Sequence, residues 1–130
     1  MEFQFPWPYT TGEWVSFGSA AITNVLGLML FIMPRISLRI LRLQTVPGHP
    51  EALSEARGTM AGFYLGVGLM AILLAQPLIY LALGVSWGFT AFGRLVSILS
   101  DKGNTLFNWI SLLFEIALAL AAVAYPLGFL

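Results

Sequence analysis

Cysteine is absent from the chain, and its absence removes several classes of chemistry. Without a thiol there is no disulfide, no thiolate ligand for a metal and no thiol redox reaction, which argues against the membrane oxidoreductases that act through cysteine pairs. Histidine occurs once, as His49 in a loop that contains proline and glycine, so no apolar segment offers an imidazole to haem or metal. We therefore expect neither a metal nor a cofactor.

Charged residues are also scarce. They make up 9% of the 130 residues, whereas hydrophobic residues make up 58%, and a soluble domain carries about 25% charged side chains. So few charges cannot cover a globular surface, and the expected surroundings of most side chains are lipid. The net charge is zero and there is no run of Lys and Arg, so nucleic acid is not an expected partner. The first 34 residues contain no Lys or Arg, unlike the start of a secretory signal.

Four apolar stretches are long enough to cross a membrane, which takes about 20 residues of helix. Pro34, the pair Gln76–Pro77 and a polar turn at residues 101–104 separate them. The predicted spans cover residues 15–33, 58–75, 78–100 and 106–125. An alternative turn at residues 84–88 would leave about 12 residues before Asp101, too few to cross, and we reject it. The sequence thus predicts one all-α domain over residues 1–130, an integral membrane four-helix bundle.

The basic residues lie at only two of the connections. Four flank the first connection and two flank the last: Arg35, Arg39, Arg42 and Arg57, then Arg94 and Lys102. The opposite side carries only Glu2 and Glu13. Because cytoplasmic loops hold the excess of Lys and Arg, both termini are predicted on the non-cytoplasmic side.

A short amphipathic segment follows the first span, at residues 35–43. Its three arginines, Arg35, Arg39 and Arg42, fall on one face of a helix, and aliphatic side chains fall elsewhere. This pattern is typical of a helix that lies on the inner membrane surface, or of a kinked continuation of the span. Contact with anionic lipid headgroups is the simpler interpretation, and docking of a protein is the alternative.

Small residues recur at helix-packing positions in the middle spans. The second span carries two overlapping GxxxG spacings and the third carries one more pair: Gly58, Gly62 and Gly66, then Gly84 and Gly88. Lipid tails are as apolar as leucine, so close approach of backbones at small residues does much to hold membrane helices together. These glycines are expected to pack the bundle itself. Docking of another membrane subunit, or self-association, is the alternative.

Two ionisable residues fall inside predicted spans. Glu115 stands nine residues after Leu106, about 13 Å along a helix, and Arg94 stands six residues before Ser100, about 9 Å. Both depths are counted from the same side of the membrane, so the two long side chains can meet between antiparallel neighbours. The sequence therefore predicts an Arg94–Glu115 pair.

Polar side chains accompany this pair. Asn108 and Ser111 stand seven and four residues before Glu115, which places all three on one face of the fourth helix. A buried ion pair that fixes the register of two helices is the structural interpretation. A pathway for a solute or for protons, or a docking site for another protein, are the functional alternatives, because intramembrane charges commonly mark functional sites.

Several short motifs resemble those of a known family. Glu55-x-Arg57-Gly58 opens the second span, Gly93-Arg94 stands late in the third, and Ser100-Asp101-Lys102-Gly103 forms the turn before the span that holds Glu115. Over about residues 15–125 this pattern resembles a family of small bacterial four-span membrane proteins whose domain has no known function. The resemblance implies a multi-pass protein of the bacterial inner (cytoplasmic) membrane, and it implies no activity.

These observations favour a non-catalytic membrane protein, an accessory or scaffold subunit that packs against a larger membrane complex. The alternative is a small transporter or channel that uses the Arg94–Glu115 pair. Small multidrug exporters are similar in size and span number, but their membrane glutamate lies in the first span, whereas Glu115 lies in the fourth. An enzyme is not expected, because the sequence has no Ser/His/Asp set, phosphate-binding glycine loop or paired carboxylates at a common depth.

Overall fold

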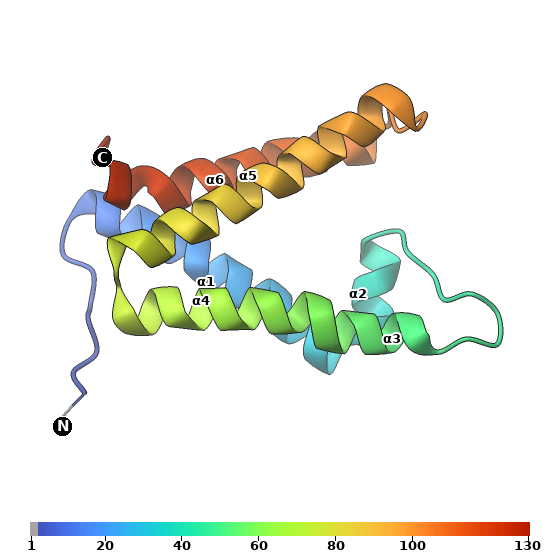
Figure 1. Cartoon of the computed structure of the whole chain (residues 1–130), viewed down its shortest axis with the longest axis horizontal. Helices are drawn as coiled ribbons and strands as arrows, with labels where there is room; N and C mark the ends of the chain where they lie inside the picture. The colour runs from blue at the N-terminus through green and yellow to red at the C-terminus, as the bar shows by residue number, and fades with distance from the viewer. Residues whose placement is uncertain (1–2) are drawn as a thin grey trace.

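The computed structural model describes residues 3–130, and over that range the chain consists of helices joined by loops (Figure 1). The helices are α1 (Thr11–Ile32), α2 (Pro34–Ile40), α3 (Glu51–Glu55), the π-helical turn η1 (Ala56–Met60), α4 (Ala61–Leu74), α5 (Pro77–Ser100) and α6 (Leu106–Leu127). Because α3, η1 and α4 follow one another without a break, they form one apolar helix, Glu51–Leu74. Within the described residues four helices are therefore long and apolar enough to cross a membrane, and the predicted all-α, multi-pass bundle is confirmed. Glu2 lies outside the described residues.

The ends of the helices follow local signals in the sequence. α1 begins after Thr10, whose hydroxyl accepts a hydrogen bond from the Glu13 backbone N–H at 3.2 Å, and α6 begins after Thr105, which accepts from the Asn108 N–H at 3.2 Å. Proline stands at the start of both α2 and α5, where its missing N–H has no partner to lose. The second spanning helix begins at Glu51, seven residues earlier than predicted, because α3 and η1 extend it toward the loop.

The turn between the second and third spans lies where the sequence predicts it. Ala75 adopts a left-handed conformation with φ 50°, and Gln76 is extended before α5 begins at Pro77. α5 then continues without interruption through residues 84–88, so the rejected alternative turn is absent from this helix.

The helices form two arms that meet at one end of the molecule. α5 packs along α6 as a hairpin, and α1 packs against α4 and also against α6. The Leu130 carbonyl lies against Gly12, so the start of α1 and the end of the chain share one end of the molecule (Figure 1). Toward the other end the α5–α6 hairpin separates from α1 and α4, and α2 with the loop after it lies there. The side of the membrane that holds the termini stays a prediction.

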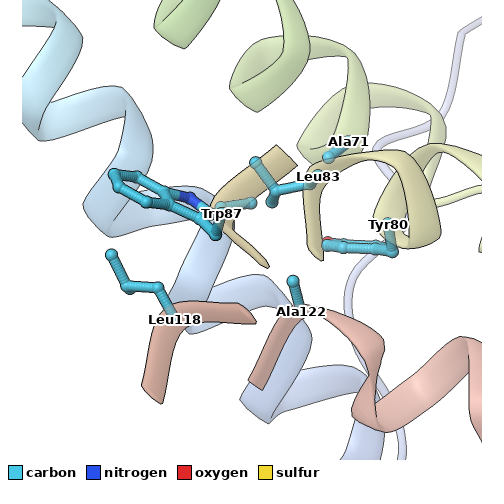
Figure 2. Packing of buried hydrophobic residues seen from close by; sticks show 7 residues of the cluster. Ala71, Tyr80, Leu83, Trp87, Leu118 and Ala122 are labelled. Atoms are coloured by element: carbon cyan, nitrogen blue, oxygen red, sulfur yellow. The ribbon is translucent and has the colours of Figure 1, made fainter. Parts of the chain in front are cut away.

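The core of the bundle is centred on Trp87 of α5, which is 5% exposed. Figure 2 shows it among buried side chains from three helices: Ala71 of α4, Tyr80 and Leu83 of α5, and Leu118 and Ala122 of α6. The Trp87 indole N–H donates to the Thr23 hydroxyl of α1 at 2.9 Å. An indole N–H without an acceptor is costly in lipid, so this bond favours one rotation of α1 relative to α5.

Small polar residues of α1 bind its start to α6. The Ser19 hydroxyl donates to the Leu118 carbonyl at 2.8 Å, and the Ser16 hydroxyl donates to the Ala122 carbonyl at 2.9 Å. The Ala122 carbonyl lacks its usual helical donor, because the residue four positions on is Pro126, which has no N–H. Ser16 therefore satisfies a backbone group that the proline leaves without a partner inside the membrane.

Candidate functional site

Arg94 of α5 and Glu115 of α6 lie in direct contact, as their calculated depths predict. Arg94 Nε donates to Glu115 Oε1, and Arg94 Nη1 donates to Asn108 Oδ1 at 2.8 Å. Asn108 Nδ2 in turn donates to the Gly103 carbonyl at 2.9 Å, so the turn between the two helices helps to orient the guanidinium. Glu115 is 4% exposed and the Arg94 side chain 25% exposed, so both charges lie largely inside the bundle.

One oxygen of the Glu115 carboxylate has no partner. Oε2 is buried and accepts no hydrogen bond from any described residue, whereas Oε1 accepts from Arg94. An ionised carboxylate offers about four lone-pair positions, and a buried acceptor without a donor costs about 1–3 kcal/mol. Oε2 is therefore an acceptor that is open to a further donor.

Glu115 borders a cavity of about 140 Å³ between the two arms, which we call the inter-arm cavity. Apolar side chains from four helices form much of its wall, among them Leu30 of α1, Ile40 of α2, Trp87 of α5 and Phe114 of α6. Polar side chains are interspersed: Ser37 of α2, Tyr64 of α4, Thr90 and Arg94 of α5, and Ser111 and Glu115 of α6. The cavity lies where the arms separate and the side chains no longer fill the space between them.

The four residues predicted around the ion pair are thus brought to one region. Arg94, Glu115 and Asn108 are joined by hydrogen bonds, and half-buried Ser111 stands in the cavity wall one turn before Glu115. The spacing within α6 explains this grouping, because residues three and four apart share a helix face. A structural or functional role for this group stays a prediction.

The three arginines after the first span are exposed at the end of the molecule where the arms separate. Arg35, Arg39 and Arg42 line one open cavity of about 550 Å³, next to Gln44. The Arg42 guanidinium also lies over the Phe107 ring of α6, 4.9 Å from its centroid, so it links α6 to the loop after α2. The predicted amphipathic segment is helical over Pro34–Ile40. Contact of the arginines with lipid headgroups stays a prediction.

Only one of the five glycines predicted to pack the bundle does so. A Cβ atom at Gly84 would collide with the Val123 side chain on α6. The other four are exposed and have no atom within 4 Å of the position that a Cβ would take: Gly58, Gly62, Gly66 and Gly88. The expectation that these four hold the bundle together is therefore wrong. Helical periodicity places the glycines on one face, but it does not identify the neighbour which that face meets.

Two glycines outside the predicted set bring α1 and α4 together. A Cβ at Gly27 would come within 2.9 Å of the Leu65 side chain, and one at Gly68 within 2.8 Å of the Asn24 side chain. The polar residues Ser16, Ser19 and Thr23 of α1 were likewise not predicted. Their spacing of three and four residues within an apolar span is the signal that indicates them, since polar side chains facing lipid are costly.

The sequence was compared with models of known protein families, and one family matches. The model of a family described as a domain of unknown function (DUF4345) matches residues 13–125, which cover nearly the whole of the four spanning helices. The chain belongs to this family. No curated protein and no solved structure matches it. The predicted family of small four-span proteins is thereby confirmed. Because the family carries no known function, the function has to be argued from the geometry of this chain.

Proposed function

We propose that this protein is a non-catalytic accessory subunit of the bacterial inner membrane that packs against a larger membrane complex. The surface that supports this proposal consists of Gly58, Gly62 and Gly66, which we call the glycine face. All three residues are exposed on the second spanning helix, with no atom within 4 Å of the position of an added Cβ. Membrane helices approach one another most closely at such rows of small residues.

Among the described residues, the glycine face makes no close contact. The bundle uses Gly27, Gly68 and Gly84 for its own close approaches. In a helix interior glycine is disfavoured relative to alanine by about 1 kcal/mol, so three bare glycines in a row cost stability that a contact outside the chain would offset. The occupant we propose is a membrane-spanning helix of the larger complex, with its backbone laid against this row.

Cross-linking in native membranes tests this proposal directly. The chain has no cysteine, so a single Gly62→Cys variant can be cross-linked at one position, and Gly93→Cys on α5 is a matched control at another exposed glycine. We expect Gly62→Cys to yield a product of fixed size, larger than two copies of the chain, and Gly93→Cys to yield far less of it. A product with twice the mass of the chain would replace the proposed partner by a second copy.

A substitution separates docking from folding. Gly62→Leu adds a bulky side chain where the bundle has open space, so the thermal midpoint of the purified protein should change little. The same side chain would hold a partner helix away, so the protein should leave the larger complex on native gels. If Gly62→Leu remains in a complex of unchanged size, the glycine face is not the docking surface.

A transport function is the second candidate, and the inter-arm cavity is the observation that favours it. Glu115 borders this cavity with one carboxylate oxygen unpartnered, and intramembrane carboxylates commonly mark ion pathways. Proton flux into liposomes containing the protein and a pH-sensitive dye tests this function. Flux should disappear in a folded Arg94→Gln/Glu115→Gln variant, and flux no greater than that of empty liposomes would exclude the candidate.

A further inference from the structure

The inter-arm cavity contains an acceptor that nothing in the described chain satisfies. Glu115 is 4% exposed, and its Oε2 atom is buried without a hydrogen-bond donor. Buried polar groups nearly always have a partner, which is a protein group, an ordered water or a ligand. Oε2 is therefore open to a partner that enters the cavity from outside the described residues.

Several nearby polar groups already have acceptors of their own. The Thr90 hydroxyl donates to the Ser86 carbonyl at 3.0 Å, and the Ser37 hydroxyl donates to the Met33 carbonyl at 2.7 Å, in each case one turn back in the same helix. The Trp87 N–H donates to the hydroxyl of Thr23, which is not among the residues that line the cavity. The Tyr64 and Ser111 hydroxyls also line the cavity, but neither donates to Oε2, which remains open.

Charge restricts the identity of the occupant. Arg94 and Glu115 are the only fully charged residues among those that line the cavity, and together they are neutral. A charged ligand would bring an uncompensated charge into a low-dielectric site, which is strongly unfavourable. The occupant that fits is uncharged and carries a hydroxyl or N–H group as donor.

The volume of the cavity and its opening to the bilayer further restrict the identity of the occupant. A cavity of about 140 Å³ is close to the ~150 Å³ that accommodates a benzene ring in a protein core. Three lining residues, Ile40, Leu41 and Phe114, are themselves exposed, so the cavity opens on the outside of the bundle. Because these exposed lining side chains are apolar, a lipid-soluble molecule can reach the opening from the bilayer.

We infer that the inter-arm cavity binds a small, uncharged, lipid-soluble molecule whose hydroxyl or N–H group donates a hydrogen bond to Glu115 Oε2. The ring of such a molecule, of the phenol or aromatic alcohol class, lies against Trp87 and Phe114. This inference rests on the cavity and not on the glycine face. Its failure would therefore leave the proposed docking function untouched.

The test uses two probes of similar size that differ in one group. 4-Methylphenol carries a donor and 4-fluorotoluene does not. Met29 lines the cavity, whereas Met70 is exposed on α4, so the methyl NMR signals of these two residues distinguish binding from partition into detergent. We expect 4-methylphenol to shift the Met29 signal saturably and with about tenfold or greater affinity than 4-fluorotoluene, since a hydrogen bond to a charged group supplies that factor.

A blocking variant gives a second measurement. Ser111→Phe places a ring in the wall of the cavity, and it should abolish the Met29 shift while the Met70 signal stays unchanged. Equal affinities for the two probes in the unmodified protein would overturn the inference, whatever the variant does. Parallel shifts of Met29 and Met70 would overturn it as well, because they indicate partition and not a site.

Discussion

The Ser16 hydroxyl on α1 supplies the hydrogen bond that Pro126 on α6 cannot supply to the Ala122 carbonyl. The same hydroxyl oxygen accepts the Tyr125 backbone N–H at 3.1 Å, so one side chain pairs with both a carbonyl and an N–H of the helical turn that precedes the proline. Ser16 is fully buried. A proline near the end of a spanning helix is thus accommodated by the neighbouring helix.

Replacing this serine should destabilise the bundle at the end where the two arms meet, which we call the closed end. We expect Ser16→Ala to lower the free energy of unfolding in detergent by about 1–2 kcal/mol, because backbone groups of α6 lose their partner. Ser86→Ala is the matched control, since that hydroxyl is exposed and donates only to its own helix at the Ala82 carbonyl. Equal losses in the two variants would show that the contact with α6 contributes nothing.

The two classes of glycine on α4 should respond oppositely to alanine. A methyl group at Gly68 would press on the Asn24 side chain, so Gly68→Ala should destabilise the protein by about 1–3 kcal/mol. A methyl group at Gly62 meets open space, so Gly62→Ala should be neutral or stabilising by up to about 1 kcal/mol. Thermal unfolding of both variants in one detergent measures the difference. A similar loss at both positions would contradict the helix packing described above.

The ion pair should respond unequally to removal of its members. Glu115→Gln leaves Arg94 without its counter-charge, and we expect a loss of about 3 kcal/mol, near the lower limit for buried pairs because Arg94 is partly exposed. Arg94→Gln should cost less, since Glu115 can then take up a proton and become neutral.

A double-mutant cycle measures their coupling. The Arg94→Gln/Glu115→Gln variant should be more stable than the sum of the two single losses predicts. Denaturant or thermal unfolding of all four proteins supplies the cycle. Additive losses would mean that the contact contributes no energy to the fold, despite its position.

The position of both termini on the non-cytoplasmic side can be tested with reporter fusions. The basic residues of the first and last connections predict that a fusion at Leu130 reports an external location and one within residues 47–54 a cytoplasmic location. The start of α1 and Leu130 lie at the same end of the molecule (Figure 1). The structure therefore requires only that reporters at these two positions indicate the same side of the membrane. A cytoplasmic signal from the Leu130 fusion would reverse the assignment.

The features predicted well from the sequence are those set by local signals. Apolar length, together with Pro34, Pro77 and the polar turn before Leu106, was enough to place four helices. The Arg94–Glu115 contact was also predictable, because a short turn makes α5 and α6 antiparallel neighbours and fixes their relative depth. Counting residues from that turn then gives the height of each side chain.

The features that escaped prediction depend on how separate helices are rotated. The spacing of Gly58 and Gly62 gives a face of the second span, but the angle at which α1 meets that span decides that Gly68 packs instead. Ser16 and Ser19 are only weakly polar, so a hydropathy profile does not distinguish them from the rest of the span, although they bind α1 to α6. The inter-arm cavity arises from the angle between the two arms, and no local pattern in the sequence encodes that angle.

Because the two arms meet at only one end, a small tilt of a helix at that end produces a large displacement at the other end. An α-helix of 24 residues such as α5 is about 36 Å long, so each degree of tilt about the closed end moves its far end by about 0.6 Å. Spanning helices adjust to a thinner or thicker bilayer by tilting. A change in bilayer thickness therefore alters the width of the inter-arm cavity much more than the spacing between Ser16 and α6.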